Sequence, residues 1–436
     1  MEAGSRIYWP RVVDDELQGQ LASARVVVLE GPKACGKTFT ARRVAASEVL
    51  LDVDEDARAA AAADPALILD GAVPRLIDEW QLEPKVWNHI RRVADDRGLP
   101  GQFILSGSAV PADDATRHTG AGRIGRIRMR PMSLFETGHS NGAVSLAELL
   151  AGEAPRSPDP GSTVATIAER IAVGGWPGFR ELPTPAGVRA VASYLDEISR
   201  ADINRIKQPS REAEGITAAR RDRDRDPARV HRFLRSLARN VATAAAVTKL
   251  AADTGGAGEP LARNTVYDYL YALERLMIVE DQPAWQPHLR SRRHLRVTPK
   301  RHFVDPSLAV AALGASPERL LKDLNFLGLL FESLVIRDLR IYAQAADADV
   351  LYYNDNSGLE VDTVIQARDG RWAAFEVKLG GQKLIEEGAA NLLRFAEQVD
   401  TTRSGAPASL GVIVATGYGY MRDDGIAVVP LCALKP

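Results

Sequence analysis

The spacing of two glycines, a lysine and a threonine near the start of the chain constrains its fold more than any other feature. Gly31 is followed by four residues and then by Gly36, Lys37 and Thr38, which is the spacing of a phosphate-binding loop. The apolar run Val26 to Leu29 precedes this loop, and helix-forming residues follow it. A strand, a glycine-rich loop and a helix in this order predict a parallel α/β domain that binds a nucleotide at the loop.

The chemistry of phosphate binding accounts for the residue types in this loop. Glycines let backbone N–H groups approach phosphate oxygens that side chains would keep away. We expect the Lys37 ammonium to contact the β- and γ-phosphates and the Thr38 hydroxyl to bind Mg²⁺. The sequence therefore predicts that ATP and Mg²⁺ bind to Gly31, Pro32, Lys33, Ala34, Cys35, Gly36, Lys37, Thr38 and Phe39.

A pair of acidic residues, Asp78 and Glu79, follows the apolar pair Leu76 and Ile77. A carboxylate at the end of a strand is typical of the second half of such a site. Asp78 would hold Mg²⁺ through water, and Glu79 would polarise the water that attacks the γ-phosphate. An Asp-Glu pair alone is equally typical of an exposed acidic turn, but its place behind a strand and a P-loop favours catalysis.

Further motifs follow in a fixed order, and together they resemble a known family. They are Ile77-Asp78-Glu79-Trp80-Gln81, Phe103-Ile104-Leu105-Ser106-Gly107-Ser108, Gly122-Arg123-Ile124, Pro131-Met132-Ser133-Leu134-Phe135-Glu136, Gly174-Gly175-Trp176-Pro177 and His302-Phe303-Val304-Asp305-Pro306. The set is similar to bacterial and archaeal AAA-superfamily ATPases whose C-terminal domain of unknown function has a restriction-endonuclease-like core. The family usually has an aliphatic residue where this chain has Trp80.

The resemblance implies two further roles. Ser106 would lie at the end of the third strand, where AAA proteins carry a polar sensor of the γ-phosphate. Arg123 and Arg126 are candidates for the arginine that stabilises charge during hydrolysis, either in its own subunit or in a neighbouring one, which would require oligomers. Each arginine could equally form a surface salt bridge.

A second group of charged residues near the end of the chain has the layout of a PD-(D/E)XK site. Glu376 and Lys378 alternate along one predicted strand, so both point to the same face. Asp362 ends the preceding strand, and Glu332 lies on the helix before it. Glu332, Asp362 and Glu376 would hold Mg²⁺, and Lys378 would position or activate a water. Glu376 and Lys378 could also be one surface ion pair, and nuclease-like folds also serve as inert binding modules.

The predicted fold class is α/β, and four regions separate by pattern. They are an AAA-like parallel-sheet domain, a helical lid or linker, a winged-helix-like region and a restriction-endonuclease-like domain, at residues 1–150, 151–226, 227–298 and 299–436. Helices followed by Ile278-Val279 fit either a winged helix or a plain three-helix unit. Short apolar runs predict strands at Val26–Leu29, Leu67–Leu69, Leu76–Ile77, Phe103–Leu105, Val350–Tyr353, Val361–Ile365, Trp372–Val377 and Leu410–Val414. Two helices are expected in the last region, around Leu327–Tyr342 and at residues 385–398.

Charge and cysteine content limit the partners and the compartment. The net charge of -2 is too balanced to indicate nucleic acid, so such a partner must be argued from a local patch. One basic cluster could be a solvated loop or could bind a phosphate backbone, and it comprises Arg290, Arg292, Arg293, His294, Arg296, Lys300 and Arg301. Two cysteines, Cys35 and Cys432, with no apolar run long enough for a membrane, predict a cytoplasmic protein.

These observations lead to one expected function and one alternative. We expect a magnesium-dependent ATPase coupled to a nuclease-like domain that acts on DNA or RNA, and the family type suggests phage defence or a toxin–antitoxin pair. The alternative is a signalling or scaffold ATPase whose C-terminal domain binds a protein partner and cuts nothing.

Overall fold

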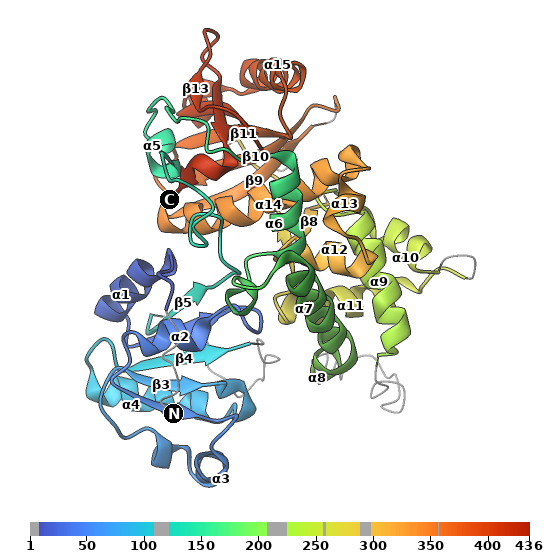
Figure 1. Cartoon of the computed structure of the whole chain (residues 1–436). Helices are drawn as coiled ribbons and strands as arrows, with labels where there is room; N and C mark the ends of the chain where they lie inside the picture. Colours follow the sequence, from blue (N-terminus) through green and yellow to red (C-terminus); the bar gives the residue numbers. More distant parts are fainter. Residues whose placement is uncertain (1–7, 109–121, 207–224, 256–258, 288–297, 356) are drawn as a thin grey trace. The chain divides into compact units, whose positions relative to one another are not determined.

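The computed structural model describes residues 8–108, 122–206, 225–255, 259–287, 298–355 and 357–436 (Figure 1). The chain forms two compact units that are interleaved in sequence. The first comprises residues 1–131, 200–226 and 270–278, and the second comprises residues 132–199, 227–269 and 279–436. In the described part of the chain, no helix is both long enough and apolar enough to cross a membrane.

The first unit contains a five-stranded sheet in the order β2-β3-β4-β1-β5, in which all neighbouring strands are parallel. Its strands are β1 Val26–Glu30, β2 Ser47–Leu50, β3 Arg75–Asp78, β4 Phe103–Gly107 and β5 Ile124–Arg128. Its helices include α1 Val13–Ser23, α2 Lys37–Arg42, α3 Glu55–Ala63, α4 Val86–Arg97 and the short α8 Ile203–Arg205. The predicted parallel α/β architecture is confirmed.

Strand β1 is continuously apolar because both faces of this sheet are covered. Val26 and Val28 contact the cluster that contains Ile90 of α4, whereas Val27 and Leu29 contact the cluster that contains Leu17 of α1. All four valine and leucine side chains are fully buried. This burial holds the start of the glycine-rich loop in a fixed position.

One predicted strand, Leu67–Leu69, is wrong. Pro65–Ile68 is instead a 3-10 helix, η1, in which the Asp64 side chain accepts a hydrogen bond from the backbone N–H of Ala66. The cap and the proline at its first position favour a helical turn. Leu67 is 66% exposed, so the apolar run does not indicate a buried strand here.

Helices dominate the middle of the chain, as predicted. They are α5 Leu146–Leu150, α6 Val164–Val173, α7 Thr184–Glu197, α9 Pro227–Arg239, α10 Val247–Gly255, α11 Arg263–Arg275, α12 Ser307–Leu313 and α13 Pro317–Leu320. Strands β7 Val279–Gln282 and β8 Lys300–Phe303 form an antiparallel pair. Three helices followed by a two-stranded ladder agree with both predictions, a winged helix and a three-helix packing unit.

A six-stranded sheet forms the C-terminal part of the second unit, in the order β13-β14-β12-β11-β10-β9. The strands are β9 Ala348–Asn354, β10 Glu360–Ala367, β11 Trp372–Lys378, β12 Ser409–Val414, β13 Tyr420–Met421 and β14 Ala427–Pro430, and the helices are α14 Leu324–Ala345 and α15 Gln382–Gln398. Every strand and helix predicted in this region is present. The expectation that Asp362 ends a strand is wrong, because Asp362 is the third residue of β10. The hairpin between β10 and β11 turns at Asp369-Gly370, where Gly370 has a φ of 92°.

A buried polar network joins three of the sequence motifs to α14. The backbone N–H of Gly175 donates to Asp305 Oδ2 at 2.9 Å, and Arg337 Nη1 donates to the same oxygen at 2.8 Å. Arg337 also donates to Asp338, which accepts from the backbone N–H of Leu134 at 2.9 Å. These motifs therefore fix the architecture of the second unit, since their polar atoms bond to one another in its interior.

Candidate nucleotide site and C-terminal ion cluster

The glycine-rich loop runs from the end of β1 to the start of α2. A Cβ at Gly31 would lie 2.5 Å from the carbonyl oxygen of Met129 and 2.8 Å from Cys35 Sγ, so a side chain has no room there. Gly36 adopts a φ of 106°, which other residues rarely accept. The Lys37 side chain is buried, and Nζ donates to the carbonyl oxygens of Gly31 and Pro32 at 2.9 Å each.

Asp78 is the last residue of β3 and lies at the end of the sheet where the P-loop begins. Strands β1, β3 and β4 are parallel, so their carboxyl ends lie at the same end of the sheet. This arrangement brings three predicted residues together, Thr38, Asp78 and Ser106. Thr38 Oγ1 donates to Asp78 Oδ2 at 2.9 Å, and the Ser106 hydroxyl donates to Asp78 Oδ1. A hydroxyl and a carboxylate side by side form an oxygen donor set that fits Mg²⁺.

The environment of Asp78 changes its acidity. Burial raises the pKa of Asp78 to about 6, the Thr38 hydrogen bond opposes this change, and the charge of Glu79 adds to it. The Lys37 ammonium lowers the pKa of Asp78. The carboxylate is therefore ionised at neutral pH, which is the state that can bind a cation.

Glu79 is held by residues that the motif analysis did not assign a role. Its backbone is left-handed, with a φ of 51°. Ser108 Oγ donates to Glu79 Oε2 at 3.0 Å, and the Gln81 amide donates to the same oxygen. Ser108 is the first residue after β4, and its position two residues beyond Ser106 is the one signal in the sequence for this contact.

Two further side chains support the P-loop from outside it. Lys33 Nζ lies 2.5 Å from Asp202 Oδ1, and the Asp202 side chain is only 7% exposed. Arg11 Nη1 donates to the carbonyl oxygen of Cys35 at 2.8 Å, and its Nη2 donates to that of Arg130 at 2.8 Å. Neither Arg11 nor Asp202 belongs to a recognisable motif, so neither contact could be predicted from the sequence.

The two candidate arginines lie in or just before β5, and each forms an ion pair with an acidic side chain. Arg123 precedes β5 and donates to Asp95 Oδ1 at 2.7 Å, and its carbonyl accepts from the N–H of Val26, at the start of β1. Arg123 therefore lies at the amino end of β1, whereas the P-loop follows its carboxyl end. The structure does not bring Arg123 to the nucleotide site of its own subunit. Arg126 pairs with Glu30 and lies 5.3 Å from the Trp87 ring centroid. A role in a neighbouring subunit stays a prediction for both.

The four residues predicted to form a PD-(D/E)XK site do converge. Lys378 Nζ lies 2.6 Å from Glu376 Oε2 and 3.6 Å from Asp362 Oδ2. The backbone N–H of Val377 donates to Asp362 Oδ2 at 2.9 Å. Glu332 is also buried beside this group, with 7% of its surface exposed.

Lys300 lies among these carboxylates, and the interpretation of Lys300 as part of a solvated basic loop is wrong. It is 2% exposed, and Nζ lies 2.8 Å from Glu332, 2.6 Å from Glu360 and 3.4 Å from Asp362. Arg301 is likewise turned inward, toward the Ala245 carbonyl at 2.8 Å. The other members of the basic cluster lie outside the described residues.

The prediction that Glu332, Asp362 and Glu376 hold Mg²⁺ does not fit this geometry. Within the described ranges, no three His, Cys, Asp or Glu side chains are arranged to hold a metal ion. The physical reason is the Lys300 ammonium, which contacts two of the three carboxylates that a cation would need.

Burial and charge set the protonation of this cluster. Burial opposes the charge of Lys300, but the carboxylates of Glu332, Asp362 and Glu360 outweigh it and raise the pKa of Lys300 well above its usual value. Burial raises the pKa of Glu332 to about 8, although Lys300 opposes this change. One carboxyl group beside the buried ammonium therefore carries a proton near neutral pH.

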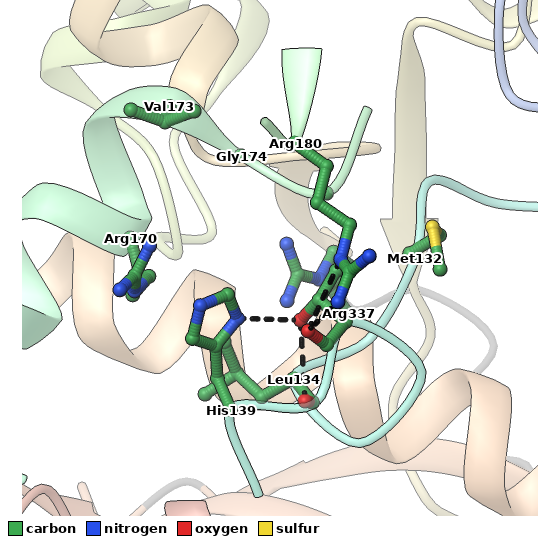
Figure 2. Close-up of a pocket in the computed structure, with 10 residues that line it drawn as sticks. Met132, Leu134, His139, Arg170, Val173, Gly174, Arg180 and Arg337 are labelled. Carbon is green, nitrogen blue, oxygen red and sulfur yellow. Dashed lines mark hydrogen bonds between the residues drawn. The ribbon is translucent and has the colours of Figure 1, made fainter. Parts of the chain in front are cut away.

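A small pocket in the second unit lies apart from every predicted site residue (Figure 2). His139, Arg170, Arg180 and Arg337 are among its lining residues. His139 Nδ1 lies 2.8 Å from Thr137 Oγ1, and Arg180 Nη2 donates to the Thr137 carbonyl at 3.0 Å. Burial, followed by the three arginines, lowers the pKa of His139 to about 4, so this imidazole is neutral at physiological pH.

Comparison with known proteins assigns the first part of the chain. Residues 23–138 match the family model described as an AAA domain. This part of the chain is therefore similar to AAA domains. Residues 164–319 and 327–434 match two domains of unknown function, DUF8612 and DUF4143. The first of these matches runs through the sequence boundaries that we predicted at residues 226 and 298.

Two other comparisons complete the picture. The Walker-type ATPase PABY2304 of Pyrococcus abyssi is similar over 69% of this chain and 94% of that chain, with 13% sequence identity and a TM-score of 0.40. Among curated proteins, none matches the sequence.

Proposed function

We propose that the AAA-type domain binds ATP with Mg²⁺ and hydrolyses it. The meeting of Thr38, Asp78 and Ser106 at one sheet edge supports this proposal most directly, because the P-loop begins at the same edge. Lys37 would contact the β- and γ-phosphates, and Thr38 and Asp78 would hold the metal ion. Bound Mg²⁺ would neutralise charge that develops on the phosphate oxygens.

Glu79 would act as the group that polarises water. Its carboxylate is oriented by the Ser108 hydroxyl and the Gln81 amide, so it is held beside the residue that would bind the metal. A carboxylate in this position can accept a proton from an attacking water. The arrangement thus separates metal binding, at Asp78, from proton transfer, at Glu79.

The substitution Glu79→Gln tests this proposal. We expect ATP affinity to stay within about 2-fold, because Asp78 and Thr38 remain, and turnover to fall by about 10²-fold or more, because the base is lost. Glu55→Gln, on the exposed surface of α3, is the matched control and should behave as the wild type. Turnover near the wild-type rate in Glu79→Gln would show that another group activates the water.

The C-terminal domain offers a second candidate function, a binding module that cuts nothing. The sequence left this alternative open beside metal-dependent cleavage of DNA or RNA, and the position of Lys300 favours the binding module. Single- and double-stranded DNA and RNA should therefore survive incubation with the protein, ATP, Mg²⁺ and Mn²⁺. Cleavage that disappears in Asp362→Asn would restore the nuclease assignment.

A further inference from the structure

The Lys300 side chain crosses the interior of the second unit to reach carboxylates from two other elements. Lys300 is the first residue of β8, Glu332 lies in α14, and Glu360 and Asp362 lie in β10. The three distances from Nζ are 2.8, 2.6 and 3.4 Å. One ammonium group therefore has the carboxylate neighbours that a small cation would have.

The carboxylate oxygens of Asp362 and Glu376 are also occupied by donors. Asp362 Oδ2 accepts from the backbone N–H of Val377 at 2.9 Å, while Oδ1 faces Lys300. Glu376 accepts from Asn391 Nδ2 at 2.7 Å on Oε1 and from Lys378 Nζ at 2.6 Å on Oε2. A divalent ion would have to displace these donors and lie next to two ammonium groups.

Charge balance gives the same result. A buried carboxylate is tolerated only when it is paired or protonated. Of the four acidic residues, Asp362 and Glu376 each have a lysine ammonium, at 3.4 and 2.6 Å, and Glu332 is the one that carries a proton near neutral pH. The fourth, Glu360, is partly exposed, with 44% of its side chain accessible. The positive charges that the buried carboxylates need are thus the ammonium groups of Lys300 and Lys378.

We propose that the Lys300 ammonium takes the place of a divalent cation, so that this cluster is a metal-independent ion cluster. It joins β8, α14 and the hairpin of β10 and β11 through ion pairs and hydrogen bonds. The proposal concerns the second unit and does not depend on ATP hydrolysis at the P-loop, which serves as an independent readout of the same preparations.

The test compares Lys300→Met with the wild type in the absence of nucleotide. Methionine has a similar length but no charge. The variant therefore leaves Glu332, Asp362 and Glu376 with Lys378, which is 25% exposed, as the remaining lysine in the described part of the cluster. We expect its melting temperature to fall, and Mn²⁺ or Mg²⁺ to restore part of the loss. Lys322→Met, on an exposed site, is the control and should show neither effect.

Direct counting of bound Mn²⁺ by electron paramagnetic resonance keeps the proposal testable if Lys300→Met fails to fold. The wild type and Asp362→Asn should bind equal amounts of Mn²⁺, because the cluster holds none. Binding in the wild type that Asp362→Asn removes would overturn the proposal. A folded Lys300→Met variant that ignores divalent ions would also overturn it, because Lys300 would then not be what excludes the metal.

Discussion

At the scale of single residues, the nucleotide site depends on the absence of a side chain as much as on charged groups. Gly31 lies against the Met129 carbonyl and the Cys35 sulfur, so the loop and the strand end touch through backbone atoms. Lys37 is held by carbonyl oxygens of the same loop. The position of the lysine therefore follows from the close packing at Gly31.

The substitution Gly31→Ala should destabilise the first unit and weaken ATP binding. Its Cβ would lie 2.5 Å from a backbone oxygen, and overpacking of this kind costs about 1–3 kcal/mol. Denaturant unfolding and nucleotide titration measure the two effects. Gly19→Ala in α1, where no atom lies within 4 Å, should instead stabilise the protein by up to about 1 kcal/mol. Equal behaviour of the two variants would contradict this description of the loop.

The raised pKa of Glu332 makes a prediction about pH. Its pKa is about 8 in the folded protein, against an ordinary value of 4.5, so the unfolded chain loses this proton first as pH rises. Stability must therefore fall between those values, relative to a side chain that cannot ionise. Glu332→Gln should gain unfolding free energy relative to the wild type from pH 5 to 8, measured with denaturant. The control is Glu387→Gln, at an exposed site, whose unfolding free energy should depend on pH as that of the wild type does. The same pH dependence for Glu332→Gln would contradict the prediction.

At the scale of helices and strands, the sequence predicts elements with a strong apolar pattern and misses those without one. The buried strands β1 and β4 were predicted because they are continuously apolar, whereas β2 and β5 carry polar and charged residues at the two edges of the sheet. Asp78, Glu79 and Ser106 could be placed because each lies at or just beyond the carboxyl end of a strand. Lys300 could not, because it follows a basic run and its partners lie in other elements.

The short segment that ends at Asp202 is expected to support nucleotide binding through Lys33. Asp202→Asn removes an ion pair whose lysine is 40% exposed, so we expect a loss of up to about 1 kcal/mol. This corresponds to roughly a 5-fold weaker affinity for ATP. Isothermal titration measures it, with Asp70→Asn, at a 95% exposed side chain, as the control. Unchanged affinity would mean that this contact does not shape the loop.

At the scale of the whole molecule, residues far apart in sequence share one buried network in the second unit. Asp305 accepts from Gly175 and from Arg337, so it joins three segments of the chain. The Arg337 and Asp305 side chains are 2% and 0% exposed. Removal of Asp305 leaves the buried Arg337 with Asp338 as a counter-ion but takes away one of its two carboxylate partners and the acceptor of the Gly175 N–H. This loss is more costly than that of a surface pair.

Asp305→Ala should therefore lower the unfolding free energy of the second unit by about 3–5 kcal/mol. Asp347→Ala breaks an ion pair whose two side chains are 81% and 68% exposed, and should cost less than about 1 kcal/mol. Calorimetry with and without nucleotide separates the unfolding of the two units. Similar costs for both substitutions would show that the network does not hold the segments together.

The bond between Leu134 and Asp338, which spans 204 positions, has a consequence for the order of events during synthesis. The sheet of the AAA-type domain has all five strands once Arg128 has been made. The hydrogen bond of Leu134 can form only after α14 has left the ribosome. The pairing of Val144 with Leu434 can form only later, when the end of the chain has been made. A growing chain therefore has every strand of its nucleotide-binding sheet long before the second unit can close.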